Sequence, residues 1–281
     1  MSETTLAQAV ETFALTGVRL SDAALEKHWQ WGAYDSEGVR FAFFLTYQEL
    51  RELATRTAAQ RAVQGPVMTP AQRILAQHHA AYMDLRGILV GVDEDELDRE
   101  PAESEWSLRA VLGHIIDSEQ GFFSVISYAL DRQRSGDGQP LEMPEPDEEE
   151  EEDEEDEDDS SQETLKQILA NYDMLHFQIL YDLASISEDE LRALSFFWEG
   201  YPMEIRFRLH RFDAHLRQHT IQVEKTLAGI GHQLHEAEQL VRMIYGALGE
   251  AEGARIGAWE MNADQWHNAA EVITKRAGEI V

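Results

Sequence analysis

Cysteine is absent from the 281 residues of this chain, and its absence excludes several kinds of chemistry. Without cysteine the chain can form no disulfide, offer no thiolate to a metal ion and use no cysteine nucleophile. Any metal site must therefore be built from nitrogen or oxygen ligands. A thiol, if the chemistry needs one, has to come from outside the protein.

Basic residues are scarce, with 23 Lys and Arg against 54 Asp and Glu, which gives a formal net charge of −31. This balance argues against nucleic-acid binding, because phosphate contacts need clustered basic side chains. No apolar run reaches the roughly 18 residues of a membrane-spanning helix, and the N-terminus lacks the basic start and apolar core of a signal peptide. We therefore expect a soluble, cytoplasmic protein that binds neither nucleic acid nor a membrane.

Much of the negative charge lies in one tract, residues 147–159, in which thirteen consecutive residues are Asp or Glu. Like charges at this density repel one another, and the tract has no apolar surface to bury. The surrounding segment, about 134–161, is therefore predicted to be a disordered, solvated loop. The alternative interpretation is that the tract binds cations or a basic partner.

Outside this segment apolar residues recur at helical spacing, and strand signals are too few for a sheet. Four central helices are predicted, over residues 70–90, 107–132, 165–183 and 205–227. Thr69 and Ser107 are suitable N-caps for the first two helices. Residues 196–202, which contain Gly200 and Pro202, are predicted to form a turn-bearing loop.

The predicted fold is all-α, a four-helix bundle with additional helices at the N- and C-terminal ends. Three regions are expected: an N-terminal helical extension over residues 1–66, the bundle with its acidic loop over 67–230, and a C-terminal helical pair over 231–281. Residues 41–56 and the two stretches 233–248 and 259–279 have the amphipathic spacing of the additional helices.

Two histidines one helical turn apart, His215 and His219, are the most informative feature of the chain. Residues four apart share one face of a helix, so both imidazoles can point at one ion. His114 borders the apolar stripe of the second predicted helix, and a ligand from a facing helix would complete a three-histidine site. His210 projects toward solvent and is set aside. The alternative is that the three histidines are ordinary hydrogen-bonded residues at the edge of the core.

Glu119 lies near the middle of the apolar stripe of the second helix, where an unpaired carboxylate is costly. It is a candidate for orienting a ligand histidine through a hydrogen bond. A salt bridge to Arg208 or Arg211 of the fourth helix is an equal alternative.

The sequence around these histidines resembles a known family. The match runs from about residue 72 to residue 227 and comprises the motifs Gly91-Val92-Asp93, Glu105-Trp106-Ser107-Leu108-Arg109, Val111-Leu112-Gly113-His114 and His215-Leu-Arg-Gln-His219-Thr-Ile-Gln222. Together these motifs resemble the DinB-like (DinB/YfiT-type) family of metal-binding four-helix bundles. The chain differs from the family pattern in its acidic insertion, in the segment before residue 66 and in the C-terminal helical pair.

The resemblance implies that one divalent metal ion is bound by His114, His215 and His219. It implies zinc or nickel as the ion, with iron or manganese as alternatives. Characterised relatives include S-transferases and isomerases that use a low-molecular-weight thiol, namely bacillithiol, mycothiol or glutathione. No thiol-binding residue of the family maps onto this chain, so the catalytic residues are not assigned.

The expected function is that of a metal-dependent transferase or hydrolase acting on a small-molecule substrate, with a thiol-dependent S-transferase as the specific case. A bound ion would act as a Lewis acid and lower the pKa of a water or thiol. The alternative is a non-catalytic helical module that has a structural metal or none and binds a basic partner. A homodimer is a further expectation.

Overall fold

The computed structural model describes residues 4–31, 38–137, 143–144, 163–196 and 200–281. The acidic tract, residues 147–159, lies outside the described residues. Two compact units are formed. The first contains residues 1–68, 75–93 and 231–281, and the second contains residues 69–74 and 94–230.

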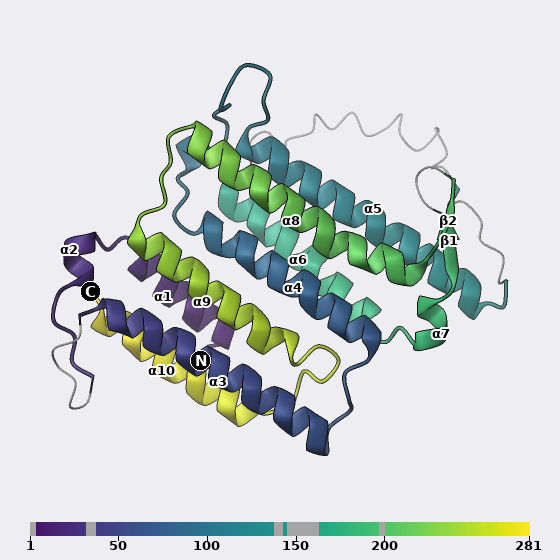
Figure 1. The fold of residues 1–281 in the computed structure, drawn as a ribbon, viewed down its shortest axis with the longest axis horizontal. Coiled ribbons are helices and arrows are strands. Elements are labelled where there is room, and N and C mark those ends of the chain that lie inside the picture. The colour runs from purple at the N-terminus through teal and green to yellow at the C-terminus, as the bar shows by residue number, and fades with distance from the viewer. Residues whose placement is uncertain (1–3, 32–37, 138–142, 145–162, 197–199) are drawn as a thin grey trace. The chain divides into compact units, whose positions relative to one another are not determined.

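The all-α prediction is confirmed (Figure 1). In chain order the elements are α1 (Leu6–Gly17), α2 (Asp22–Leu25), α3 (Arg40–Gln64), α4 (Pro70–Leu89), the 3-10 helix η1 (Glu94–Glu96), α5 (Leu108–Arg134), α6 (Leu165–Leu183), α7 (Glu188–Leu191), β1 (Leu194–Phe196), β2 (Pro202–Glu204), α8 (Ile205–Gly229), α9 (Glu236–Gly253) and α10 (Ala263–Glu279). The four central helices that the sequence predicts are α4, α5, α6 and α8. Among the described residues, no helix is both long enough and apolar enough to cross a membrane.

The first unit joins the N-terminal and C-terminal segments of the chain. Helix α1 packs against α9 and α10, and α3 packs against the same two helices. The rings of Phe13 in α1 and Phe43 in α3 meet edge to face with centroids 5.0 Å apart. The guanidinium of Arg276 in α10 donates hydrogen bonds to Thr46 Oγ1 and to the carboxylate of Glu49, both in α3. The segments 1–66 and 231–281 thus share one core.

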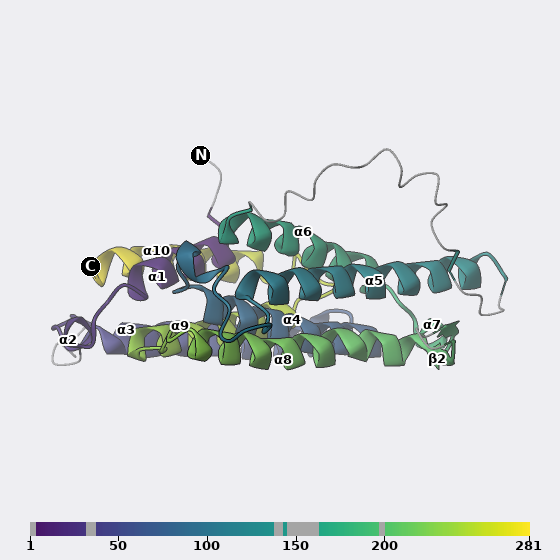
Figure 2. The same ribbon diagram turned by 90° about the horizontal axis from the view of Figure 1, so that it is seen from above.

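The second unit is organised around α5, which packs against both α6 and α8 (Figure 2). Each helix directs an apolar stripe inward, as the helical spacing predicts. The fully buried members of these stripes include Val111, Leu112, Ile115 and Ile126 of α5, Tyr172 and Ile179 of α6, and Phe212, Leu216 and Val223 of α8. The phase of the three stripes decides which polar side chains reach the space between the helices.

The loop predicted over residues 196–202 is flanked by a short antiparallel strand pair, which the sequence does not predict. Strand β1 pairs with β2, with Ser195 opposite Met203. The Ser195 hydroxyl donates to the Met203 carbonyl at 3.2 Å and accepts from Arg208 Nε at 2.6 Å. Strands of three residues are too short for alternation of apolar and polar side chains to reveal them. Residues 197–199 lie outside the described part of the chain.

Candidate metal centre

Helix α5 begins where the sequence predicts, and this start sets the position of His114. The Ser107 hydroxyl accepts a hydrogen bond from the Ala110 amide at 3.3 Å and so caps the helix N-terminus. Arg109 anchors the same turn, because its guanidinium donates to both carboxylate oxygens of Asp98, at 2.6 and 3.1 Å, and to the Glu163 carbonyl at 2.6 Å. The motif residues before His114 therefore fix the first turns of α5.

Helix α8 carries His215 and His219 on its inner side. Both imidazoles are buried, whereas His210, about 1.4 turns before His215, is exposed. The apolar stripe of the helix predicts this difference in burial, since Phe212, Leu216 and Val223 are buried on the same side as His215 and His219. The sequence thus places the histidines of α8 correctly relative to the core.

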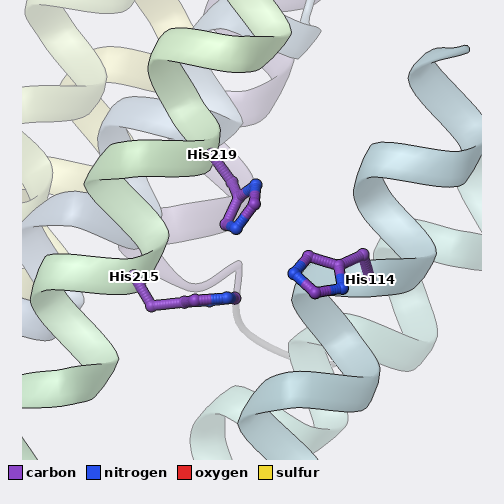
Figure 3. Close-up of side chains that lie close together, drawn as sticks. All are labelled: His114, His215 and His219. Atoms are coloured by element: carbon purple, nitrogen blue, oxygen red, sulfur yellow. The ribbon is translucent and has the colours of Figure 1, made fainter. Parts of the chain in front are cut away.

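The three histidines that the sequence singles out lie together in the second unit (Figure 3). His215 and His219 extend from α8 toward His114 on α5. Ring centroids are 5.1 Å apart for His114 and His215, 4.6 Å for His114 and His219, and 4.3 Å for His215 and His219. Each ring offers one nitrogen, and these nitrogens all lie within 4.8 Å of one another.

Burial keeps two of these imidazoles neutral. Desolvation lowers the pKa of His215 to about 4, assisted by the neighbouring rings and by the charge of Arg211. Desolvation is the largest cause that lowers the pKa of His219 and outweighs the raising effect of its hydrogen bond to Gln222, while His114 lowers this pKa further. A neutral imidazole has a free lone pair, which is the form that binds a metal ion.

One ring nitrogen of His219 has a defined partner. His219 Nδ1 lies 2.8 Å from Gln222 Oε1, on the next turn of α8. An amide oxygen only accepts hydrogen bonds, so this contact places the ring proton on Nδ1 and leaves the lone pair on Nε2. Gln222 is part of the motif quoted above, and its spacing of three residues from His219 is the signal that would have indicated this contact.

The donor set fits a divalent ion of the zinc type. Three nitrogens around one tetrahedral zinc ion lie about 3.4 Å apart, so nitrogens already within 4.8 Å need only small side-chain rotations to bind it. His215 Nδ1 is buried and has no hydrogen-bond partner among the described residues. In the same ranges no further histidine, aspartate or glutamate joins the three.

Aromatic rings flank the three histidines. The Trp106 indole lies 5.1 Å from the His114 ring, between centroids, and the Phe122 ring lies edge to face with His215 at 5.3 Å. Trp106 is 46% exposed, so its end of the site is close to solvent. Asp117, which follows His114 by three residues, is exposed.

Glu119 is fully buried, and the structure places it beside α6. Its carboxylate accepts a hydrogen bond from the Tyr172 hydroxyl at 2.9 Å and lies within 4.8 Å of a ring nitrogen of His176. Desolvation raises the pKa of Glu119 to about 8, opposed by the Tyr172 hydrogen bond. Of the two alternative salt bridges, the one to Arg211 is not formed, since Arg211 makes no ion pair within the described part of the chain. The one to Arg208 stays a prediction.

Comparison with known proteins identifies one related group. The family model described as the DinB superfamily matches residues 77–223, which is more than half of the chain and includes all three histidines. Neither the comparison with curated proteins nor the comparison with solved structures found a match.

Proposed function

The chain belongs to the DinB superfamily, and we propose that it binds one divalent metal ion through His114, His215 and His219 and uses it in a transfer or hydrolysis reaction. The observation that carries this proposal is the meeting of three ring nitrogens, from two helices, within 4.8 Å of one another. Zinc or nickel suits a site of three imidazoles best, with iron and manganese as alternatives.

An open coordination position supports a catalytic role over a structural one. Structural zinc sites use four protein ligands, whereas catalytic sites use three and leave one position for a water or a substrate. The three imidazoles have no fourth histidine or carboxylate beside them in the described ranges. A bound divalent ion would supply Lewis acidity, which makes a proton on a water or thiol easier to remove.

Because the chain has no cysteine, its own residues cannot supply a thiol nucleophile. If the reaction transfers a sulfur group, the thiol must be a separate small molecule. A low-molecular-weight thiol as co-substrate is the specific case that we propose, and the cytoplasm, where such thiols stay reduced, is the proposed compartment.

Cobalt(II) substitution tests this function. We expect metal-free protein to bind one equivalent of cobalt(II) and to change its visible spectrum when 2-mercaptoethanol is added at about pH 7.5, because metal binding by histidine is favoured at a pH above neutrality. The His215→Ala variant should give neither signal. A cobalt spectrum that responds to neither thiol nor azide would indicate a closed site and would favour the alternative of a non-catalytic helical module.

A further inference from the structure

We propose that Arg211 is a substrate-binding residue of the three-histidine site and that it recognises an anionic group, a carboxylate or a phosphate, on the small molecule that enters. This inference rests on the proposed function, because it names the chemical class of the substrate for the same site. It concerns a side chain that neither the sequence motifs nor the metal proposal uses.

Arg211 differs from the other arginines of α8 in having no hydrogen-bonding or ionic partner within the described residues. The others are engaged: Arg206 pairs with Glu188, Arg208 Nε donates to Ser195 Oγ, and Arg217 pairs with Asp213. The Nε of Arg211 is buried and unsatisfied. A partly buried guanidinium without a protein acceptor is costly, and an acceptor supplied by a bound molecule would offset that cost.

The position of Arg211 links it to the three histidines. It lies one helical turn before His215, on the same side of α8. Its Cζ lies 5.8 Å from the centroid of the Phe122 ring, and that ring meets the His215 ring edge to face.

The contact of Arg211 with the Phe122 ring is a cation–π contact, which occupies none of the guanidinium N–H groups. A guanidinium that lies over an aromatic ring is held through its flat face, while its N–H groups project in the plane. This fork matches the oxygens of a carboxylate or a phosphate in a bidentate pair. An oxyanion bound there would lie about one helical turn from His215, a separation that a small metabolite can span.

Two further features favour a small anion at this point. The chain carries a formal net charge of −31, so an unpaired cation beside the histidines is a local exception. Gly121 follows His114 by two turns on the same face of α5, and a Cβ added at Gly121 would meet no atom within 4 Å. Gly121 is exposed, so the surface of α5 at this position is open to solvent.

The experiment measures the binding of acetate, inorganic phosphate and neutral acetamide by calorimetry to wild type, Arg211→Gln and Arg211→Lys. Arg217→Gln is the matched control, because it removes an equal charge from the same helix away from the site. Each protein is used both zinc-loaded and metal-free. We expect Arg211→Gln to lose roughly tenfold or more in affinity for the preferred anion and nothing for acetamide, because it loses a charge-assisted bidentate contact.

Arg211→Lys should give an intermediate affinity, since an ammonium keeps the charge but not the fork. The preference of the wild type between acetate and phosphate identifies which oxyanion the substrate carries. Equal anion affinity in wild type, Arg211→Gln and Arg217→Gln, with zinc bound normally by all three, would overturn this inference and leave the metal proposal standing. Absence of zinc binding by the wild type would overturn the metal proposal, whereas anion binding that depends on Arg211 in the metal-free protein would still support this one.

Discussion

His219 Nδ1 and Gln222 Oε1 lie 2.8 Å apart on adjacent turns of α8. The amide oxygen fixes which ring nitrogen carries the proton, so the side chain of Gln222 prepares His219 to donate the lone pair of Nε2. A residue outside the predicted ligand set thus contributes to the same site. Its effect is on orientation and tautomer, and it is measurable.

Replacement of Gln222 should weaken metal binding without abolishing it. We expect Gln222→Ala to reduce zinc affinity by about 10- to 100-fold, as is usual when the partner of a ligand histidine is removed. Competition with a chromophoric chelator measures the affinity. Gln218→Ala is the control, because Gln218 is exposed on the same helix. Equal affinities for the two variants would contradict the role given to Gln222.

Glu119 should make stability depend on pH. Its pKa is about 8 in the folded chain against an ordinary 4.5, so the folded state holds the proton more tightly than the unfolded state does. The stabilisation is complete below about pH 4.5, decreases as the pH rises and is lost through pH 8.

Urea unfolding of wild type and Glu119→Gln measures this dependence, because glutamine mimics the protonated acid. We expect Glu119→Gln to be more stable than wild type by about 1 kcal/mol at about pH 5.5, and this difference to grow by roughly a further 3 kcal/mol at about pH 8.5. Asp117→Asn, which removes an exposed carboxylate from the same helix, should show little change at either pH. A difference between wild type and Glu119→Gln that does not vary with pH would contradict a protonated Glu119.

Ser107 should contribute to stability through its position at the start of α5. Ser107→Ala removes the side-chain acceptor of the Ala110 amide, and we expect a loss of about 1 kcal/mol in thermal or urea unfolding. Ser124→Ala is the matched control within the same helix. The Ser124 hydroxyl donates back to the Gln120 carbonyl, an arrangement that adds little to a helix, so this change should be neutral or slightly stabilising. The account of the α5 start would be wrong if both variants lost the same free energy.

Local signals were sufficient to predict the central helices and the grouping of the histidines. The caps at Thr69 and Ser107 and the apolar spacing of α8 depend only on nearby residues, which is why the sequence indicates them. The exposure of His210 and the burial of His215 and His219 follow from the same helical phase. Helix α1, with Leu6, Val10 and Phe13 buried at helical spacing, has the same kind of local signal.

The contacts that side chains of different helices make with one another could not be predicted from the sequence. The partner of Glu119 is Tyr172, 53 residues further along the chain, and no spacing rule connects the two residues. The lack of a hydrogen-bond partner for the buried Arg211 Nε among the described residues likewise depends on which groups of other elements come near it. The short pairing of β1 with β2 arises from the approach of two three-residue segments whose composition does not indicate strands.

The most direct test of the central claim is the metal content of freshly purified protein, measured by mass spectrometry for wild type and four single histidine variants. We predict about one divalent ion per chain in wild type and in His210→Ala. The same three-ligand geometry predicts a strongly reduced content in His114→Ala, His215→Ala and His219→Ala, with all four variants folded by circular dichroism. Equal metal content in His210→Ala and in the three site variants, or no metal in a wild-type protein offered zinc and nickel, would contradict the claim that these histidines form a metal site.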